Sequence, residues 1–404
     1  MNTISSVSPH TASLTGIESI AYLLRHAVEN QYAVAVWRLP NDSICHLILS
    51  RKLQRLSQDA ALEELPTGFL FAPFQKNNDR IFLPADFKFT FAGGSLQPAT
   101  TPAETQSHTW LQEQLRHTPY TPHTPTCYTV PPTGQETETS YAELVRKAVV
   151  EIGKSSFEKV VPSRRKIVDL PEDFDVVQAF HTLSGAYPHA LVSFVSTPET
   201  GSWLGATPET LVHVHDKTLF KTVALAGTQR FVPGTDLKTV AWTQKEIEEQ
   251  ALVERYVISC FKKIRVREYD EYGPKTVVAG NLLHLRSDFT VNMKEINFPQ
   301  LGSVMLQLLH PTSAVCGMPL EPASAFLQQY EGYDREFYAG FLGPVNVGND
   351  IHIFVNLRCL KLHDGKATLY AGAGVTVDST PENELAETEI KFQTLRKPLF
   401  DPPV

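Results

Sequence analysis

Apolar positions along the chain form strand-like and helix-like patterns in alternation. Runs that alternate or are continuously apolar, such as 32–39 and 45–49 on either side of a Pro-Asn-Asp-Ser turn, predict β-strands. Apolar residues three and four apart predict helices, most clearly at 141–152, 244–264 and 382–395. Because short turns join several of the strands, we expect antiparallel pairing and an α+β fold. Further strands are expected at 68–74, 80–83, 159–161, 190–195, 210–214, 219–223, 351–360 and 367–371, with another beginning at 277 and a short helix at 17–23.

A change of composition between residues 97 and 139 divides the chain. Seven prolines lie there among Thr, Gln, Glu and His. Proline fixes φ and removes a backbone donor, so we expect a surface excursion, interrupted by a short helix near 110–116. A length of 404 residues allows two or three domains or one large one. We expect residues 1–96 to be a strand-rich part, 97–139 to be the excursion and 140–404 to be a large α+β region.

The charge balance limits the partners of the protein. With 36 basic and 44 acidic residues, the formal net charge is −8, whereas a chain that binds nucleic acid needs a basic face. Nucleic acid is therefore not expected, and an anionic substrate must be held by locally placed cations. Five scattered cysteines without a C-x-x-C pair favour free thiols in a reducing, cytoplasmic setting. The start of the chain has no signal-peptide pattern and no apolar run reaches about 18 residues, so no membrane partner is expected.

Two pairs of glutamates have the spacing of a shared helix face. Glu246 and Glu249 lie three apart near the start of the helix expected from residue 244, and Glu384 and Glu387 repeat this spacing in the C-terminal helix. Four carboxylates from two helices would suit Mg²⁺, a hard cation that prefers oxygen ligands. Such pairs are also common on solvated faces, where the helix dipole favours them. The spacing alone does not separate these two interpretations.

Single residues within strand-like stretches are candidates for proton transfer or ligand binding. Glu209 follows a proline at the start of a strand, and Lys159 interrupts an apolar strand pattern. In a buried cleft either group could exchange a proton with a substrate, whereas on a solvent edge each would be an ordinary surface residue. His213 and His215 share one face of a strand, but without a third ligand we expect no zinc site.

Taken together, these segments and others form an ordered set after residue 140, and this set resembles the chorismate-utilising enzymes. That family includes isochorismate, salicylate, anthranilate and aminodeoxychorismate synthases. The resemblance covers roughly residues 141–395. It implies one large α+β domain of two packed antiparallel sheets with outer helices, and an active-site cleft between the halves. The segments are Lys159-Val-Val, Gly205-Ala-Thr-Pro-Glu209, Ala224-Leu-Ala-Gly-Thr228, Glu246-x-x-Glu249, Leu283-His-Leu285, His310-Pro-Thr, Asn356-Leu-Arg358, Ala371-Gly-Ala-Gly374 and Glu384-x-x-Glu387.

The resemblance also indicates a branch of the family. Aminodeoxychorismate synthases have a nucleophilic lysine where this chain has Ala226, and anthranilate synthases use ammonia and lack the lysine found here as Lys159. The activity expected is therefore that of an isochorismate synthase, an isomerase. Lys159 would deprotonate water for addition at C2 of chorismate, and Glu209 would protonate the departing C4 hydroxyl. Salicylate synthase, which goes on to eliminate pyruvate, is the alternative, and a non-catalytic anion-binding relative is a third.

The resemblance further implies a set of ligands. Mg²⁺ held by the four glutamates would bind the ring carboxylate of chorismate, and Arg358 and Lys391 would bind the enolpyruvyl carboxylate. A departure from the family pattern is Gln250, where many members have histidine. We expect a monomer without a glutaminase subunit, acting in menaquinone or siderophore synthesis. The other implied substrate-binding residues are Gly227, Thr228, His284, Val315, Tyr338, Tyr370, Gly372 and Gly374.

Overall fold

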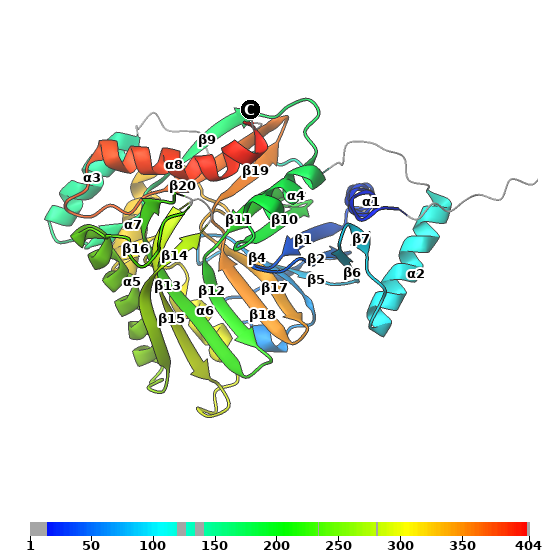
Figure 1. The fold of residues 1–404 in the computed structure, drawn as a ribbon, viewed down its shortest axis with the longest axis horizontal. Coiled ribbons are helices and arrows are strands. Elements are labelled where there is room, and N and C mark those ends of the chain that lie inside the picture. The colour runs from blue at the N-terminus through cyan, green and yellow to red at the C-terminus, as the bar shows by residue number, and fades with distance from the viewer. Residues whose placement is uncertain (1–13, 119–126, 134–140, 233, 280–281, 402–404) are drawn as a thin grey trace, which may run out of the picture.

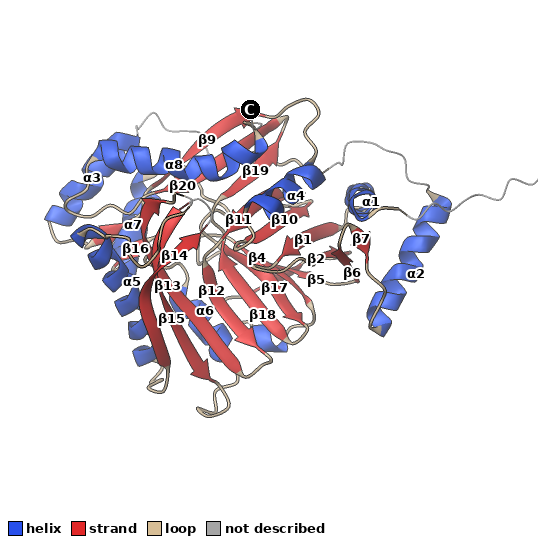
Figure 2. Cartoon of the chain, viewed as in Figure 1, coloured by secondary structure: helices blue, strands red, loops and turns tan. Residues whose placement is uncertain are grey.

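Two nine-stranded sheets organise the chain in the computed structural model, which describes residues 14–118, 127–133, 141–232, 234–279 and 282–401 (Figure 1). The strand pairings are antiparallel, which confirms the α+β fold with two antiparallel sheets (Figure 2). Three prolines of the expected surface excursion, at 119, 122 and 125, lie outside the described residues, as do the first thirteen residues.

The first sheet has the strand order β7-β6-β2-β1-β10-β11-β19-β20-β9, and the second has the order β14-β15-β13-β12-β18-β17-β4-β5-β3. A small third sheet pairs β16 (Gly317–Met318) with β8 (Lys159–Val160). The strands of the first sheet are β1 (Ala33–Arg38), β2 (Cys45–Ser50), β6 (Phe87–Ala92), β7 (Ser95–Leu96), β9 (Ser163–Asp169), β10 (Leu191–Thr197), β11 (Gly201–Thr207), β19 (Cys359–His363) and β20 (Lys366–Gly372). Those of the second are β3 (Gln54–Leu56), β4 (Gly68–Ala72), β5 (Arg80–Pro84), β12 (Thr210–His215), β13 (Leu219–Arg230), β14 (Asp270–Ala279), β15 (Leu282–Asn292), β17 (Phe341–Val347) and β18 (Asp350–Val355).

Alternation along the strands divides the core into two clusters. In β1, Ala35 and Trp37 join the cluster shared with the second sheet, whereas Val34 and Val36 face a cluster under α1, α4 and α8. The first sheet is therefore buried on both faces, which explains the continuous apolar pattern of its strands. The helices are α1 (Gly16–Glu29), α2 (Pro102–His117), α3 (Tyr141–Gly153), α4 (Val176–Ala186), α5 (Gln244–Lys263), α6 (Leu301–Leu309), α7 (Leu320–Tyr330) and α8 (Pro381–Leu399).

Helix α2 is longer than the short helix expected within the proline-rich stretch. It begins at Pro102, where a proline lacks only a donor that the first turn would leave unpaired, and Thr101 caps it. Its Trp110 stacks on Phe87 of β6, with ring centroids 4.0 Å apart. This stacking attaches the helix to the edge of the first sheet.

Two of the points at which the chain passes between the two sheets are neighbours in space. It leaves β11 of the first sheet through Pro208 and Glu209 to enter β12 of the second, and it returns from β18 to β19 through residues 356–358. The second passage corrects the single strand expected over 351–360. Arg358 there has a φ of +48°, which interrupts the extended backbone between the two strands.

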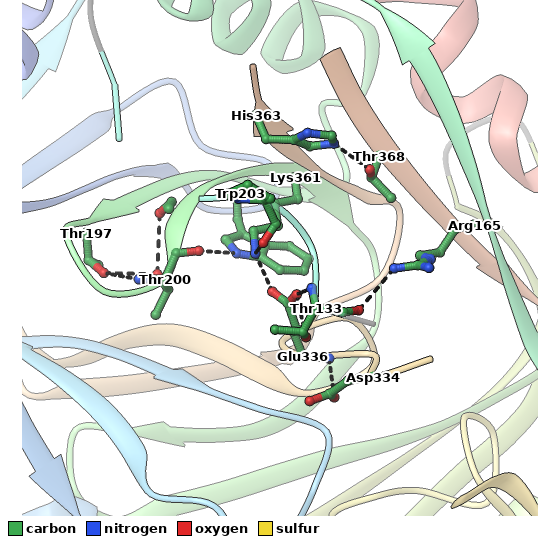
Figure 3. A network of polar contacts seen from close by, with 12 residues as sticks. Thr133, Arg165, Thr197, Thr200, Trp203, Asp334, Glu336, Lys361, His363 and Thr368 are labelled. Carbon is green, nitrogen blue, oxygen red and sulfur yellow. Dashed lines mark hydrogen bonds and ion pairs between the residues drawn. The ribbon is translucent and has the colours of Figure 1, made fainter. Parts of the chain in front are cut away.

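A buried polar network connects Thr133, at the end of the proline-rich stretch, to the first sheet (Figure 3). Lys361 of β19 is 1% exposed and pairs with Glu336, while its ammonium also donates to the carbonyl of Pro131 at 3.2 Å. The other oxygen of Glu336 accepts from the Thr133 hydroxyl at 2.9 Å. The network therefore satisfies each buried charge with a fixed partner.

None of the helices in the described residues combines the length and the apolar character that crossing a membrane requires.

Candidate active site

A cavity of about 680 Å³, counted to its open mouth, lies at the two passages between the sheets. Its walls come from segments that are far apart in the sequence, which places most of the ordered motifs around one space. The lining residues are Val161, Pro208, Glu209, Leu225, Ala226, Gly227, Thr228, Glu249, His284, Ala314, Val315, Tyr338, Leu357, Arg358, Gly372, Gly374, Glu387 and Lys391.

Backbone hydrogen bonds fix the two passages to each other. The amide of Val355 donates to the carbonyl of Glu209 at 2.9 Å, and the amide of Ala206 donates to the carbonyl of Arg358 at 3.0 Å. The Thr207 hydroxyl adds a bond to the carbonyl of Val355 at 2.7 Å. Because both passages leave the sheets at the same place, the side chains of Glu209 and Arg358 reach one cavity.

Glu209 has the electrostatic environment of a proton donor. Burial raises the pKa of its carboxyl to about 7, although Arg358, Lys159 and Lys391 act against this rise. Desolvation disfavours the carboxylate, so a large share of Glu209 is protonated near neutral pH. A carboxyl group with such a pKa can donate a proton to a leaving group at physiological pH.

Lys159 lies in β8 and is 1% exposed. Its Nζ donates to Oε1 of Glu249 at 2.6 Å. Burial would raise the pKa of the Glu249 carboxyl, but the neighbouring Lys159 outweighs burial and keeps this pKa below its usual range. Gly374 makes room for the pair, because a Cβ there would lie 2.9 Å from Oε1 of Glu249 and 3.0 Å from Cε of Lys159.

A β-bulge places Gly227 and Thr228 on the cavity wall. The register between β13 and β15 shifts between Ala226 and Gln229, and Gly227 within this interval has a φ of +66°. The carbonyl of Gly227 lies 2.6 Å from Nδ1 of His284. Since a carbonyl only accepts, Nδ1 carries the hydrogen, and burial lowers the pKa of His284 to about 3. The neutral ring therefore keeps Nε2 as a hydrogen-bond acceptor.

Helix α8 brings carboxylates and a lysine to the same cavity. Lys391 contacts Glu387 at 2.6 Å and donates to the carbonyl of Gly372 at 2.7 Å. Lys245 of α5 contacts Glu384 at 3.0 Å. Burial alone would lower the pKa of Lys245, but Glu384, Glu387 and Glu249 together raise it. Carboxylates of both α5 and α8 therefore stabilise the positive charge of the Lys245 ammonium.

The donor set fits a hard cation. Oε2 of Glu384 is buried and has no hydrogen-bond partner, and an oxygen of that kind is the ligand that Mg²⁺ prefers. In the described part of the chain, no three of the four glutamates bring their oxygens within 4.8 Å of one another. Oε2 of Glu246 accepts from the Thr243 amide at 2.8 Å and from Gln229 at 3.0 Å, so this glutamate also caps α5 and holds the bulged strand.

Some predicted residues lie beside the cavity rather than on its wall, and these are Lys159, Glu246, Glu384 and Tyr370. Tyr370 stacks behind Tyr338, with ring centroids 5.2 Å apart, and is absent from the lining. Gln250 is buried and donates to the carbonyl of Ala224 at 3.2 Å, which holds α5 against β13. Other lining residues were not predicted as site residues because their side chains carry no distinctive chemistry, although all of them except Ala314 lie within the ordered motifs. These are Val161, Pro208, Leu225, Ala314 and Leu357.

The pair His213 and His215 has the third neighbour that the sequence did not reveal. Asp350 of β18 lies opposite His215, and one potential ligand atom from each of these three residues lies within 4.8 Å of the others. A third candidate ligand, which was not apparent from the sequence, is therefore present beside the two histidines. The sequence pattern did not indicate Asp350 as a neighbour because 135 residues separate it from His215.

Comparison with known proteins agrees with this geometry. The family model of chorismate binding enzymes matches residues 76–400, and the chain belongs to this family. Isochorismate synthase EntC of Escherichia coli K12 is 27% identical over 265 residues, which cover 64% of this chain and 66% of that protein. Isochorismate synthase DhbC of Bacillus subtilis is 29% identical over 267 residues, covering 63% and 66%. The matched region thus spans just under two thirds of the length of these relatives.

Solved structures extend the likeness of fold to nearly the whole chain. The DhbC protein of Bacillus anthracis superposes with a TM-score of 0.71 at 22% identity, over 94% of this chain and 99% of that chain. The menaquinone-specific isochorismate synthase MenF of Escherichia coli also gives 0.71, at 20% identity, over 97% and 92%. The likeness at this level of identity concerns the fold alone.

Proposed function

We propose that the protein is an isochorismate synthase that converts chorismate to isochorismate. The observation that carries this proposal is that Glu209, whose pKa lies at about 7, lines the same cavity as Glu249, the carboxylate that pairs with the buried Lys159. Relatives that bear the name isochorismate synthase support the same reaction. The substrate would be a dicarboxylate, which an acidic chain can hold only where cations gather.

In the proposed reaction, Lys159 takes a proton from water, and the resulting oxygen forms a bond to C2 of the ring. The two conjugated ring double bonds both shift as the C4–O bond breaks, and Glu209 protonates the departing hydroxyl so that it leaves as water. Lysine accepts a proton only as the neutral amine. Its ion pair with Glu249 is therefore the resting arrangement, and it must loosen before catalysis.

Substrate orientation would come from the chain's own cations and acceptors. Arg358 and Lys391 line the cavity and would bind the enolpyruvyl carboxylate. The acceptor Nε2 of His284 would receive a hydrogen bond from a ring hydroxyl. Gly227, Thr228, Gly372 and Gly374 would let the substrate approach the backbone, with Val315 and Tyr338 on the apolar side. Tyr370 would support Tyr338 from behind.

Glu246, Glu249, Glu384 and Glu387 would hold Mg²⁺. When bound, this ion supplies a positive charge that attracts the ring carboxylate of the substrate. Glu249 cannot give the same carboxylate fully to Lys159 and to a metal ion, so metal binding would loosen the resting ion pair. We propose a monomer that works without a glutaminase subunit. A reducing, cytoplasmic setting is consistent with the five cysteines, all of which are free thiols.

Product analysis tests the function. The protein is incubated with chorismate, once with Mg²⁺ and once after chelation, and the products are separated by chromatography. We expect isochorismate with Mg²⁺ and none after chelation, because the unneutralised glutamates would repel a dianion. Salicylate with pyruvate as the main products would overturn the choice of isochorismate synthase. Anthranilate formed in the presence of ammonia would overturn the role of water and of Lys159.

A further inference from the structure

Four polar side chains form a square on one face of the second sheet, and none of them lines the active-site cavity. His213 and His215 lie two apart in β12, and Asp350 and His352 lie two apart in β18. The register pairs His213 with His352 and, by continuation, His215 with Asp350. Because alternate residues of a strand and directly opposed residues of an antiparallel pair project to the same side, all four share one face.

The opposite face of the same strands is the apolar core. Val212 and Val214 of β12 and Ile351 and Ile353 of β18 are all buried in the main hydrophobic cluster. The polar square therefore lies on the side that bounds a groove, whose wall includes His213, Asp350 and His352. Its side chains are fixed at their backbones by the sheet and can be reached from solvent at His215, which is exposed.

Asp350 is held in an orientation that presents one oxygen to the histidines. Its Oδ1 accepts from the backbone amide of Asp216 at 2.8 Å. Its Oδ2 lies 3.0 Å from Nδ1 of His215 and 3.6 Å from Nε2 of His352. A carboxylate fixed by an outer hydrogen bond while its second oxygen faces imidazoles is the arrangement that supports a metal ligand.

His213 supplies an unused nitrogen. Its Nε2 is buried and has no hydrogen-bond partner, and its ring stacks on His352 with centroids 4.1 Å apart. A buried polar atom without a partner is uncommon and calls for an explanation. An ion bound between the strands would provide one.

We propose that His213, His215 and Asp350 bind a Zn²⁺-type transition-metal ion, with His352 or water as the fourth ligand. One ligand atom from each of the three residues already lies within 4.8 Å of the others. Bonds of about 2.0–2.1 Å in a tetrahedron would bring these atoms to roughly 3.4 Å apart, a change that side-chain rotation can supply. Imidazole nitrogens select such ions over Mg²⁺, which prefers oxygen ligands.

The proposed ion would connect β12 to β18 at the ends remote from the active site. Glu209 precedes the first residue of β12, and its carbonyl accepts from Val355, the last residue of β18. The site is thus independent of the reaction proposed above, while it would stabilise the strand pair that carries Glu209.

Zinc binding by the full chain in excess Mg²⁺ tests the proposal, since Mg²⁺ keeps the carboxylates of the active site occupied. The probe is Zn²⁺ alone, measured by equilibrium dialysis with elemental analysis. We expect one ion per chain and a higher melting temperature with zinc. Asp350→Asn and His213→Ala should each weaken binding by at least about tenfold. His117→Ala is the control, because His117 is an exposed histidine in the last turn of α2 and should leave binding unchanged.

Absence of zinc binding to the wild-type chain would overturn the proposal. Equal affinity in the wild type and Asp350→Asn would also overturn it, because the ion would then lie elsewhere, for example at the glutamates. Circular dichroism of each variant without metal verifies that the fold is intact. Asp350→Asn keeps the shape of the side chain, so it gives a decisive result even where His213→Ala loses stability.

Discussion

Two buried lysines of this protein, Lys159 and Lys361, are each 1% exposed and each pair with a glutamate, yet their surroundings differ. Lys361 is enclosed by the carbonyl of Pro131, by Glu336 and by the ring of Trp203, whose centroid lies 5.7 Å from Nζ. Glu336 is held in turn by the Thr133 hydroxyl, which donates to its other carboxylate oxygen (Figure 3). Lys159 instead pairs with Glu249, which lines the cavity that also contains Glu209.

The difference shows that burial and an ion pair do not by themselves identify a catalytic lysine. A charge enclosed by fixed partners contributes to the stability of the fold, and breaking such a pair is costly. A charge whose partner lines an open cavity can exchange that partner for water or a substrate. We therefore propose a structural role for Lys361 and a role in proton transfer for Lys159, and each prediction below tests one side of this contrast.

The largest effect is expected for Lys159→Ala. Removing the base should lower the rate constant kcat for isochorismate formation by about 10⁴-fold, the upper end of what general-base catalysis contributes. Steady-state kinetics with chorismate and Mg²⁺ measure it, and thermal unfolding shows that the variant is folded. Isochorismate formation at the wild-type rate would remove Lys159 from the mechanism.

Glu209→Gln should lower kcat by about 10²–10⁴-fold, because an amide cannot protonate the departing hydroxyl. The substitution keeps the size of the side chain, so the fold should remain intact by circular dichroism. Near-normal turnover would refute the role of Glu209 as the acid.

The pH dependence of kcat/KM should also reflect the ionisation of Glu209, with a smaller effect than the substitutions above. Since burial raises the pKa of Glu209 to about 7, the acid is protonated below that pH and ionised above it. We expect kcat/KM for chorismate to fall about tenfold per pH unit well above pH 7. Glu209→Gln, which has no proton to lose at that position, should lack this limb. A wild-type profile that stays level from pH 7 to 9 would contradict the assignment.

The smallest effect on turnover is expected for Lys361→Ala. Leaving the Glu336 carboxylate buried without its partner should reduce the free energy of unfolding by about 3–5 kcal/mol. Denaturant unfolding measures this loss, while kcat per folded molecule should change little. A drop in kcat as large as that of Lys159→Ala, with stability unchanged, would reverse the contrast between the two lysines.

The sequence predicted the fold class and most lining residues because the motifs occur in a distinctive order. Helical spacing brought Glu246 with Glu249, and Glu384 with Glu387, onto shared faces, and the long helices α5 and α8 begin close to their expected positions. The resemblance to a family, rather than the spacing, assigned these carboxylates to a metal. Their role as ligands stays a prediction.

The sequence pattern did not predict contacts between residues that are far apart in the chain. The apolar run 351–360 conceals the passage between sheets at Arg358, because a local break in φ leaves the alternation of side chains on either side almost intact. Likewise, the pairing of β12 with β18 brings Asp350 to His215 only after distant strands have assembled. Contacts of this kind depend on strand register, which neighbouring residues do not determine.

Isotope labelling tests the central claim, that water activated in this cavity attacks the ring, most directly. The wild-type protein is incubated with chorismate and Mg²⁺ in H₂¹⁸O, and isochorismate from the initial phase is analysed by mass spectrometry. We expect one ¹⁸O atom in the new C2 hydroxyl, because the added oxygen comes from solvent and the C4 oxygen departs. Isochorismate without label would show that the original hydroxyl migrates, and would contradict the roles given to Lys159 and Glu209.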